Sequence, residues 1–204
     1  MSQYWEGVEG APASVRQPSA NPSVSEPADP PGYFLTTKRL GFRCWTARDE
    51  DLAIDLWCNP QVTALIGGPW TRDVALKRLA QEIEQQNQYG MQYWSVFLVA
   101  DGRHAGCAGI RPYEAGKASY EMGVHLLPEF WGRGIAREAA EAIIPRAFGP
   151  LGATAIVAGH HPQNVASGRL LIKLGFAYQG DKLYIPTGLM HPMYLLRREQ
   201  AASG

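Results

Sequence analysis

Residues 120–139 constrain the fold most, because they pass from an apolar strand through a glycine-rich turn into a helix. Residues 120–127 form a run of strand length, and Pro128 ends it because proline lacks a backbone donor. Gly132 and Gly134 follow, where the helix begins. Glycines let a ligand approach the backbone closely, and a helix N-terminus carries partial positive charge. The segment therefore predicts a turn that can bind an anion.

The spacing of this turn differs from two common phosphate-binding motifs. It matches neither G-x-x-x-x-G-K-[ST] nor a G-x-G-x-x-G that follows directly on a strand. Arg133 and Arg137 could add positive charge to the turn. Taken alone, however, G-x-G before a helix is equally consistent with an ordinary turn.

The rest of the chain alternates between strand-like and helix-like patterns. Strands are expected near residues 40–44, 93–100, 105–110, 120–127, 153–159, 176–178 and 193–196. Helices are expected near residues 46–57, from Thr71 onward, at 135–144 and at 164–174. This order predicts an α+β or mixed α/β domain in two or three layers.

Two local patterns within the expected helices make specific predictions. Leu76, Leu79, Ala80 and Ile83 recur every three or four residues and predict the buried stripe of the second helix. Pro145 removes an intrahelical donor and predicts that the third helix ends or kinks after about residue 144.

The zero net charge of the 204 residues, with 19 basic and 19 acidic side chains, is an average over two unlike parts. In residues 1–32, 18 positions are Pro, Ala, Ser or Gly and the net charge is −3, which predicts a flexible tail. Residues 33–204 carry +3 and are expected to form one folded domain. This balance argues against a nucleic-acid binder and a polybasic membrane anchor.

Localisation and metal binding follow from what the sequence lacks. No secretory signal or membrane-spanning run is evident, so no membrane partner is expected. The three cysteines form no C-x-x-C pair, and the five histidines form no H-E-x-x-H pattern. We therefore expect no metal site, no disulfide framework and a reducing, cytoplasmic setting.

Two motifs together carry a family resemblance. Residues 131–136 read W-G-R-G-I-A, and residues 164–176 read N-x-x-S-x-x-L-L-x-K-L-G-F. In this order and spacing, they resemble the GNAT superfamily of acyl-CoA-dependent N-acetyltransferases. Residues 37–45 and 68–71 resemble the branch that contains ribosomal-protein N-terminal acetyltransferases. The resemblance implies an α+β GNAT fold, with a twisted, mostly antiparallel sheet of six to seven strands and about four helices.

The resemblance also implies an acetyl-CoA site, with no metal. The strand backbone at Val124, His125 and Leu126 would pair with the pantetheine arm. The following residues of the turn would hold the pyrophosphate through backbone amides: Gly132, Arg133, Gly134, Ile135, Ala136 and Arg137. Asn164 would contact the cofactor arm, although it also reads as an ordinary helix N-cap. Trp131 stands where the family usually has Gln or Arg.

Transfer to an amine benefits from a general base, because an amine must lose its proton to attack. Glu121 is the candidate, since burial on an otherwise apolar strand would raise its pKa. It could equally be a strand residue in a salt bridge. The tyrosine that many relatives use as a general acid is replaced by Leu171, so Ser167 becomes the candidate acid. Some relatives place a base where this chain has Gly159.

Two functions from different classes remain open. The first is acetyl transfer from acetyl-CoA to a primary amine, either a protein N-terminus or a small amine, by direct transfer in a ternary complex. The alternative is a non-catalytic acyl-CoA-binding sensor of the same fold. His161, His191, Trp70 and Tyr184 are expected near the acceptor. The protein could be a monomer or a homodimer.

Overall fold

The computed structural model describes residues 32–114 and 117–201. The expected tail, residues 1–32, lies outside these residues except for Gly32. The helices are α1 (Glu50–Trp57), α2 (Pro60–Thr63), α3 (Arg72–Tyr89), α4 (Ile135–Phe148), α5 (Val165–Lys173) and α6 (Arg198–Ala201). The strands are β1 (Leu35–Thr36), β2 (Leu40–Arg43), β3 (Tyr93–Leu98), β4 (His104–Pro112), β5 (Ser119–Leu126), β6 (Ala155–Gly159), β7 (Ala177–Tyr184) and β8 (Leu189–Arg197). Among the described residues, no helix is long and apolar enough to cross a membrane.

The strands form one eight-stranded sheet in the order β1-β2-β3-β4-β5-β6-β8-β7. Every neighbouring pair is antiparallel except β5 and β6, which run parallel. The predicted α+β class is confirmed. The sheet has eight strands rather than six or seven because the two-residue β1 adds a short hairpin partner to β2.

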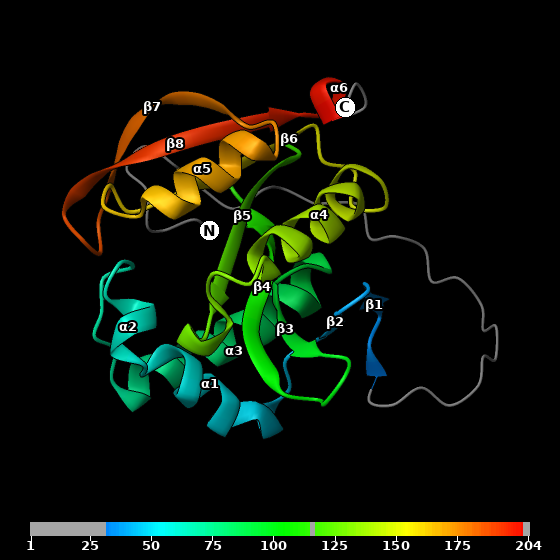
Figure 1. The fold of residues 1–204 in the computed structure, drawn as a ribbon, viewed down its shortest axis with the longest axis vertical. Coiled ribbons are helices and arrows are strands. Elements are labelled where there is room, and N and C mark those ends of the chain that lie inside the picture. The colour runs from blue at the N-terminus through cyan, green and yellow to red at the C-terminus, as the bar shows by residue number, and fades with distance from the viewer. Residues whose placement is uncertain (1–31, 115–116, 202–204) are drawn as a thin grey trace.

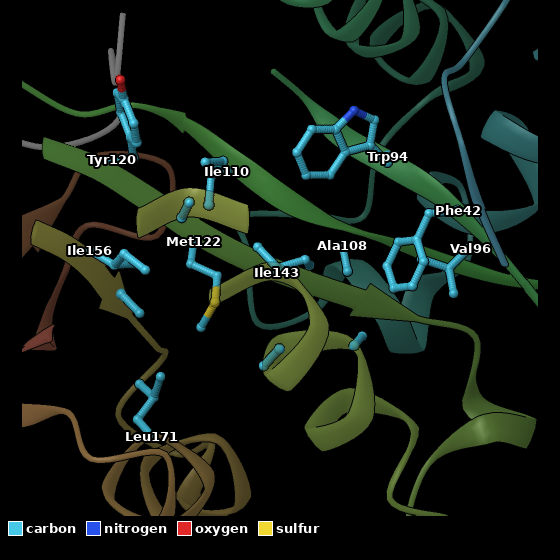
Figure 2. Close-up of a cluster of buried hydrophobic side chains, with 14 of the residues drawn as sticks. Phe42, Trp94, Val96, Ala108, Ile110, Tyr120, Met122, Ile143, Ile156 and Leu171 are labelled. Atoms are coloured by element: carbon cyan, nitrogen blue, oxygen red, sulfur yellow. The ribbon is translucent and has the colours of Figure 1, made fainter. Parts of the chain in front are cut away.

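Side chains alternate between the two faces of the sheet, so each face has its own core. On β5, Tyr120, Met122 and Leu126 join the larger core, which α4 covers through residues such as Ile143. Figure 2 shows Met122 and Ile143 in this cluster with other strand residues. The opposite face packs against α1 and α3 around Trp57 and has its own smaller core. Glu121 therefore points away from the larger core.

The predicted helix signals agree with the observed caps. Thr46 and Asp49 form a capping box, Thr71 caps α3, and the Asn164 side chain caps α5. Gly175 follows α5 with φ = +85°, which is the left-handed conformation that a C-terminal glycine provides.

The predicted stripe of α3 was partly wrong. Leu79 is buried, but Ala80 is exposed, and Arg78 and Glu82 take inward positions instead. The polar pair is stable there because the two side chains bond to each other, Nε to Oε1 at 2.6 Å. Glu82 also accepts the backbone N–H of Tyr93 at 2.7 Å.

Pro145 was predicted to end or kink the helix after about residue 144, and the first of these two outcomes is wrong. Helix α4 continues through Pro145 to Phe148. Proline removes only its own donor, and the Gly149 N–H still bonds to the Pro145 carbonyl at 2.8 Å.

The last two strands, β7 and β8, are both longer than the sequence pattern indicated. In Figure 1 the hairpin that they form reaches toward the side of the molecule that carries α2.

Candidate active site

A gap opens in the sheet where β5 and β6 separate. Their ladder joins only Ser119, Tyr120 and Glu121 to residues 155–157. Beyond Glu121, β5 continues along β4 alone, as far as Leu126. Parallel strands that diverge leave unpaired backbone groups on their inner edges. The gap is therefore a place where a ligand can pair with β5.

The direction of the β5 backbone groups follows from two flanking bonds. The Leu127 N–H bonds to Ala105 on the β4 side, and the Ala118 carbonyl accepts from Thr154 on the β6 side. Backbone groups alternate along a strand, so even-numbered residues present N–H and C=O toward β6. Val124 therefore directs its N–H into the gap.

The other two strand residues predicted to hold the cofactor differ from Val124. The Leu126 carbonyl also faces the gap, but it already accepts the indole Nε1 of Trp131 at 2.8 Å. His125 has its backbone turned to β4 by the same alternation, and its ring lines the cleft. The Trp57 indole donates to Nδ1 of that ring at 3.3 Å.

The glycine-rich turn ends this gap with a set of backbone donors. Gly132 and Gly134 adopt φ = +69° and +73°, and α4 begins without a side-chain N-cap. Within the described chain, no carbonyl or side chain accepts from the N–H groups of residues 132–137. Such donors at a helix N-terminus suit a phosphate or pyrophosphate. The turn therefore fits the group that the sequence predicted for it.

The hairpin between β1 and β2 fixes the shape of this turn. Arg39 donates from its guanidinium to the Arg133 carbonyl at 2.8 Å. It also pairs with Glu138 in the first turn of α4, through Nε at 2.5 Å and its backbone N–H at 2.9 Å. Thr37 donates its hydroxyl to the same carboxylate. Together these bonds turn the carbonyl of Arg133, the residue between the two glycines, toward Arg39 and away from the gap.

Replacing Arg39 with Ala is expected to raise KM for acetyl-CoA several-fold with a smaller change in kcat, because the turn loses the bond that orients it. Arg39→Lys should restore little of the lost affinity, since a single ammonium group cannot bond to both the Arg133 carbonyl and the Glu138 carboxylate as the planar guanidinium does. Steady-state kinetics with varied acetyl-CoA measure both constants. Arg48→Ala, on an exposed 3₁₀ turn, is the control. An unchanged KM in Arg39→Ala would contradict the positioning role.

A cleft of about 470 Å³ connects the gap, the turn and helix α5. It collects most of the predicted site residues, namely Glu121, Val124, His125, Leu126, Gly132, Gly134, Ile135, Ala136, Arg137, Asn164 and Ser167. Arg133 is not part of the lining, and its side chain is exposed. The expected acceptor-side residues Trp70, Tyr184, His161 and His191 also line the cleft.

Glu121 lies in the wall of the cleft, on the face of β5 opposite the larger core. It is 8% exposed and faces Arg111, with Oε2 3.7 Å from the guanidinium. The Arg111 guanidinium lies 4.1 Å from the centre of the Tyr93 ring. Gly123 makes room for that ring, because a methyl group there would lie 2.3 Å from it. These contacts fix both charged groups beside the gap.

Sequence reasoning missed the polar residues beneath Glu121. Arg78, Tyr93 and Arg111 line the cleft, and Glu82 supports them from α3. Burial raises the pKa of the Tyr93 phenol, so this group is neutral near pH 7. The only signal in the sequence was Arg111 at the end of an apolar strand, and nothing local indicated its partner.

The sequence of this chain matches a known domain family, which identifies the kind of protein that contains this cleft. Residues 39–177, more than half of the chain, match the model of the acetyltransferase (GNAT) domain. The chain belongs to the GNAT acetyltransferase family. It is accordingly an N-acetyltransferase, and acetyl-CoA is its acetyl donor.

Individual relatives agree with this assignment. The N-acetyltransferase p20 of Bacillus licheniformis is 28% identical over 148 residues, which cover 72% of this chain and 83% of p20. A GNAT acetyltransferase structure from Bacillus anthracis superposes with a TM-score of 0.70 at 20% identity, covering 81% of this chain and 98% of that one. RimL, a ribosomal L7/L12 alpha-N-protein acetyltransferase solved with coenzyme A, gives a TM-score of 0.67 at 15% identity, covering 81% and 98%. The structural likenesses show the same fold.

Helix α5 of this GNAT domain presents few polar groups to the cleft. Asn164 uses its side-chain oxygen to accept the Ser167 N–H at 3.1 Å, which leaves its amide nitrogen as a donor. Ser167 lines the cleft one turn into the helix. Leu171 is buried in the larger core. The position where many GNAT relatives carry tyrosine is thus apolar and packed inward.

Two histidines that line the cleft, His125 and His191, are held neutral near pH 7. Burial, with the charges of Arg78 and Arg111, lowers the pKa of His125 to about 3. Burial, with His161 and His160 nearby, lowers the pKa of His191 to about 4. Thr187 Oγ1 lies 2.8 Å from His191 Nε2. No group of three or more metal-ligating side chains occurs in residues 32–114 and 117–201.

The free energy of unfolding is expected to fall as the pH drops from about 6.5 to about 4. In that interval, unfolded histidines, with a pKa of about 6.5, bind protons that folded His125 and His191 do not. Stability is therefore complete above the unfolded pKa and lost as acid is added. Urea unfolding at several pH values measures the slope. His191→Gln should flatten this slope. A wild-type stability that stayed constant or increased as the pH dropped would contradict the prediction.

Proposed function

We propose that this GNAT protein acetylates a primary amine by direct transfer, with Glu121 as general base and Ser167 as general acid. The observation that carries the proposal is the gap between β5 and β6. It places the Val124 N–H, the Glu121 carboxylate and the uncapped end of α4 along a single cleft. RimL, a protein of the same fold, has been solved with coenzyme A, which supports the proposal that this cleft binds the coenzyme.

The cofactor half of the cleft runs from Val124 to the glycine-rich turn. The backbone donors of residues 132–137 would hold the pyrophosphate, and the free edge of β5 would pair with the pantetheine arm. Asn164 can donate its amide to the same arm. The coenzyme supplies an activated acetyl group, and these residues bind and orient it.

The chemistry of the proposed step follows from the groups around the gap. Glu121, through a water molecule, takes a proton from the acceptor ammonium, so that the nitrogen lone pair can attack the thioester carbon. The Val124 N–H donates to the carbonyl oxygen as negative charge develops on it. The C–N bond forms, the C–S bond breaks, and Ser167 gives its hydroxyl proton to the leaving sulfur. The Ser167 oxygen then recovers a proton from the newly bonded nitrogen, which becomes the neutral amide.

One observation favours the alternative, an acyl-CoA-binding sensor. Of the α5 residues, only Ala166, Ser167 and Leu170 line the cleft, and Ser167 alone bears a polar side chain. A weak general acid is compatible with transfer, because a thiolate with a pKa of about 8.5 leaves readily. It is equally compatible with binding alone.

Two measurements separate these functions. Acetyl-CoA is expected to raise the melting temperature, because a ligand that binds only the folded state stabilises it by mass action. Free thiol is then expected to appear only when an amine is added, with the acetylated amine detected by mass spectrometry. A melting shift without thiol release on any amine would support the sensor. If acetyl-CoA did not change the melting temperature, both functions would be contradicted.

A further inference from the structure

The cleft continues past Glu121, on the side away from the glycine-rich turn. We call this part the acceptor chamber and define it by Val62, Leu65, Ile66, Trp70, Tyr184 and His191, all of which line the cleft. Helix α2 with the loop after it provides four of these residues, and the β7–β8 hairpin provides the other two.

We propose that the acceptor is a small monoamine with an apolar or aromatic body, and that polyamines and aminoglycosides are poor acceptors. The inference rests on the proposed acetyl transfer and names the substrate class of the same site. Three features of the acceptor chamber support it: the charges, the walls and the contact between the two walls.

The charges of the cleft leave no place for a second ammonium group. Among the described residues that line it, Glu121 is the only carboxylate, and it faces the Arg111 guanidinium at 3.7 Å. The Glu82 carboxylate beneath the lining is bonded to Arg78 at 2.6 Å. Each acid is therefore matched by an arginine. A buried cation without an anionic partner is strongly unfavourable, so extra ammonium groups penalise binding.

The walls of the acceptor chamber are apolar or aromatic. Leu65, Ile66 and Trp70 are half-buried on one side. Tyr184 lies against His191, with ring centroids 4.7 Å apart, on the other. The low pKa of His191 means that its imidazole is uncharged near pH 7. These surfaces favour a hydrocarbon or an aromatic ring over a charged chain.

The two walls of the acceptor chamber meet where the loop after α2 contacts the turn between β7 and β8. A methyl group added at Gly67 would lie 2.5 Å from Cβ of Pro186 and 2.9 Å from its carbonyl oxygen. The loop after α2 and the turn between β7 and β8 therefore touch, with Gly67 at φ = +93°. The whole cleft, about 470 Å³, must also contain the end of the cofactor arm. The remaining space suits a small amine better than an extended peptide.

The test compares 2-phenylethylamine, spermidine, kanamycin and a seryl tetrapeptide. Titration calorimetry measures their binding to the protein saturated with coenzyme A, and thiol release from acetyl-CoA measures kcat/KM. We expect 2-phenylethylamine to exceed each of the others by about tenfold or more in both assays. Equal or better use of spermidine or kanamycin would overturn the charge argument. Equal or better use of the peptide would overturn the argument from the contact between the two walls.

A charge variant tests the cause. Gln61 has an exposed side chain that lines the cleft, and Gln61→Glu adds one carboxylate of the same size. This variant is expected to raise the preference for spermidine relative to 2-phenylethylamine about tenfold. Gln81→Glu makes the same change on α3, outside the cleft lining, and should leave the ratio as it was. An unchanged ratio in Gln61→Glu would contradict the inference.

The same experiment separates this inference from the proposed function. Preferred binding of 2-phenylethylamine without thiol release would overturn acetyl transfer but support the selectivity of the acceptor chamber. Thiol release that favours spermidine would support transfer and overturn the selectivity. If no amine was bound and no amine was turned over, both the proposed function and the selectivity of the acceptor chamber would be overturned.

Discussion

Replacing Glu121 with Gln is expected to lower kcat by about a hundredfold or more, because a positioned general base contributes about 10²–10⁴-fold to a proton-transfer step. The amide keeps the size of the carboxylate but cannot accept the amine proton. Acetyl-CoA binding should be retained, since the cofactor half of the cleft is built from β5 backbone and the glycine-rich turn. Thiol-release kinetics at saturating acetyl-CoA, over a range of pH, measure the effect.

The matched control is Glu84→Gln, the same change on an exposed position of α3 outside the cleft. It should leave kcat and the pH profile unaltered. If Glu121→Gln kept full kcat across the pH range, Glu121 would be only the ion-pair partner of Arg111. If it lost the melting shift caused by acetyl-CoA, the carboxylate would instead shape the cofactor site.

Substituting Gly132 with Val is expected to raise KM for acetyl-CoA by about tenfold to a hundredfold. At φ = +69° a β-branched residue is strained, so the turn must change its backbone and redirect its N–H groups. Each hydrogen bond to a charged group is worth about 1.5–3 kcal/mol, so loss of one accounts for this range. Titration of acetyl-CoA by calorimetry measures the loss directly.

Gly152→Val separates strain from binding. Gly152 has φ = +67° and open space around it, as Gly132 has, but it lies before β6 and outside the cleft. Both variants should lose similar stability, about 1–2 kcal/mol. Only Gly132→Val should weaken acetyl-CoA binding. Equal affinity in the two variants would show that the turn does not hold the pyrophosphate.

Features encoded locally could be predicted from the sequence. The path from strand to turn to helix around Gly132 and Gly134, the cap at Asn164 and the glycine after α5 all depend on neighbouring residues. The family motifs lie in these same segments. This is why most of the predicted cofactor-side residues line one cleft.

Features that depend on distant contacts could not be predicted. Arg78 and Glu82 look like a surface pair on α3, and only the register of β3 brings the Tyr93 N–H to Glu82. Arg111 meets Glu121 because β4 pairs with β5 in one particular register. Likewise, the clamp from Arg39 to the turn joins residues 94 positions apart. Local patterns carry no information about such pairings.

Initial velocities of thiol release, with acetyl-CoA and an amine varied together, test the central claim most directly. Direct transfer requires both substrates in the cleft at once. It predicts double-reciprocal lines that intersect and thiol release that depends on the amine. Parallel lines would indicate an acetylated enzyme, and acetyl-CoA binding without amine-dependent thiol release would indicate a sensor. Either result would contradict direct transfer beside Glu121.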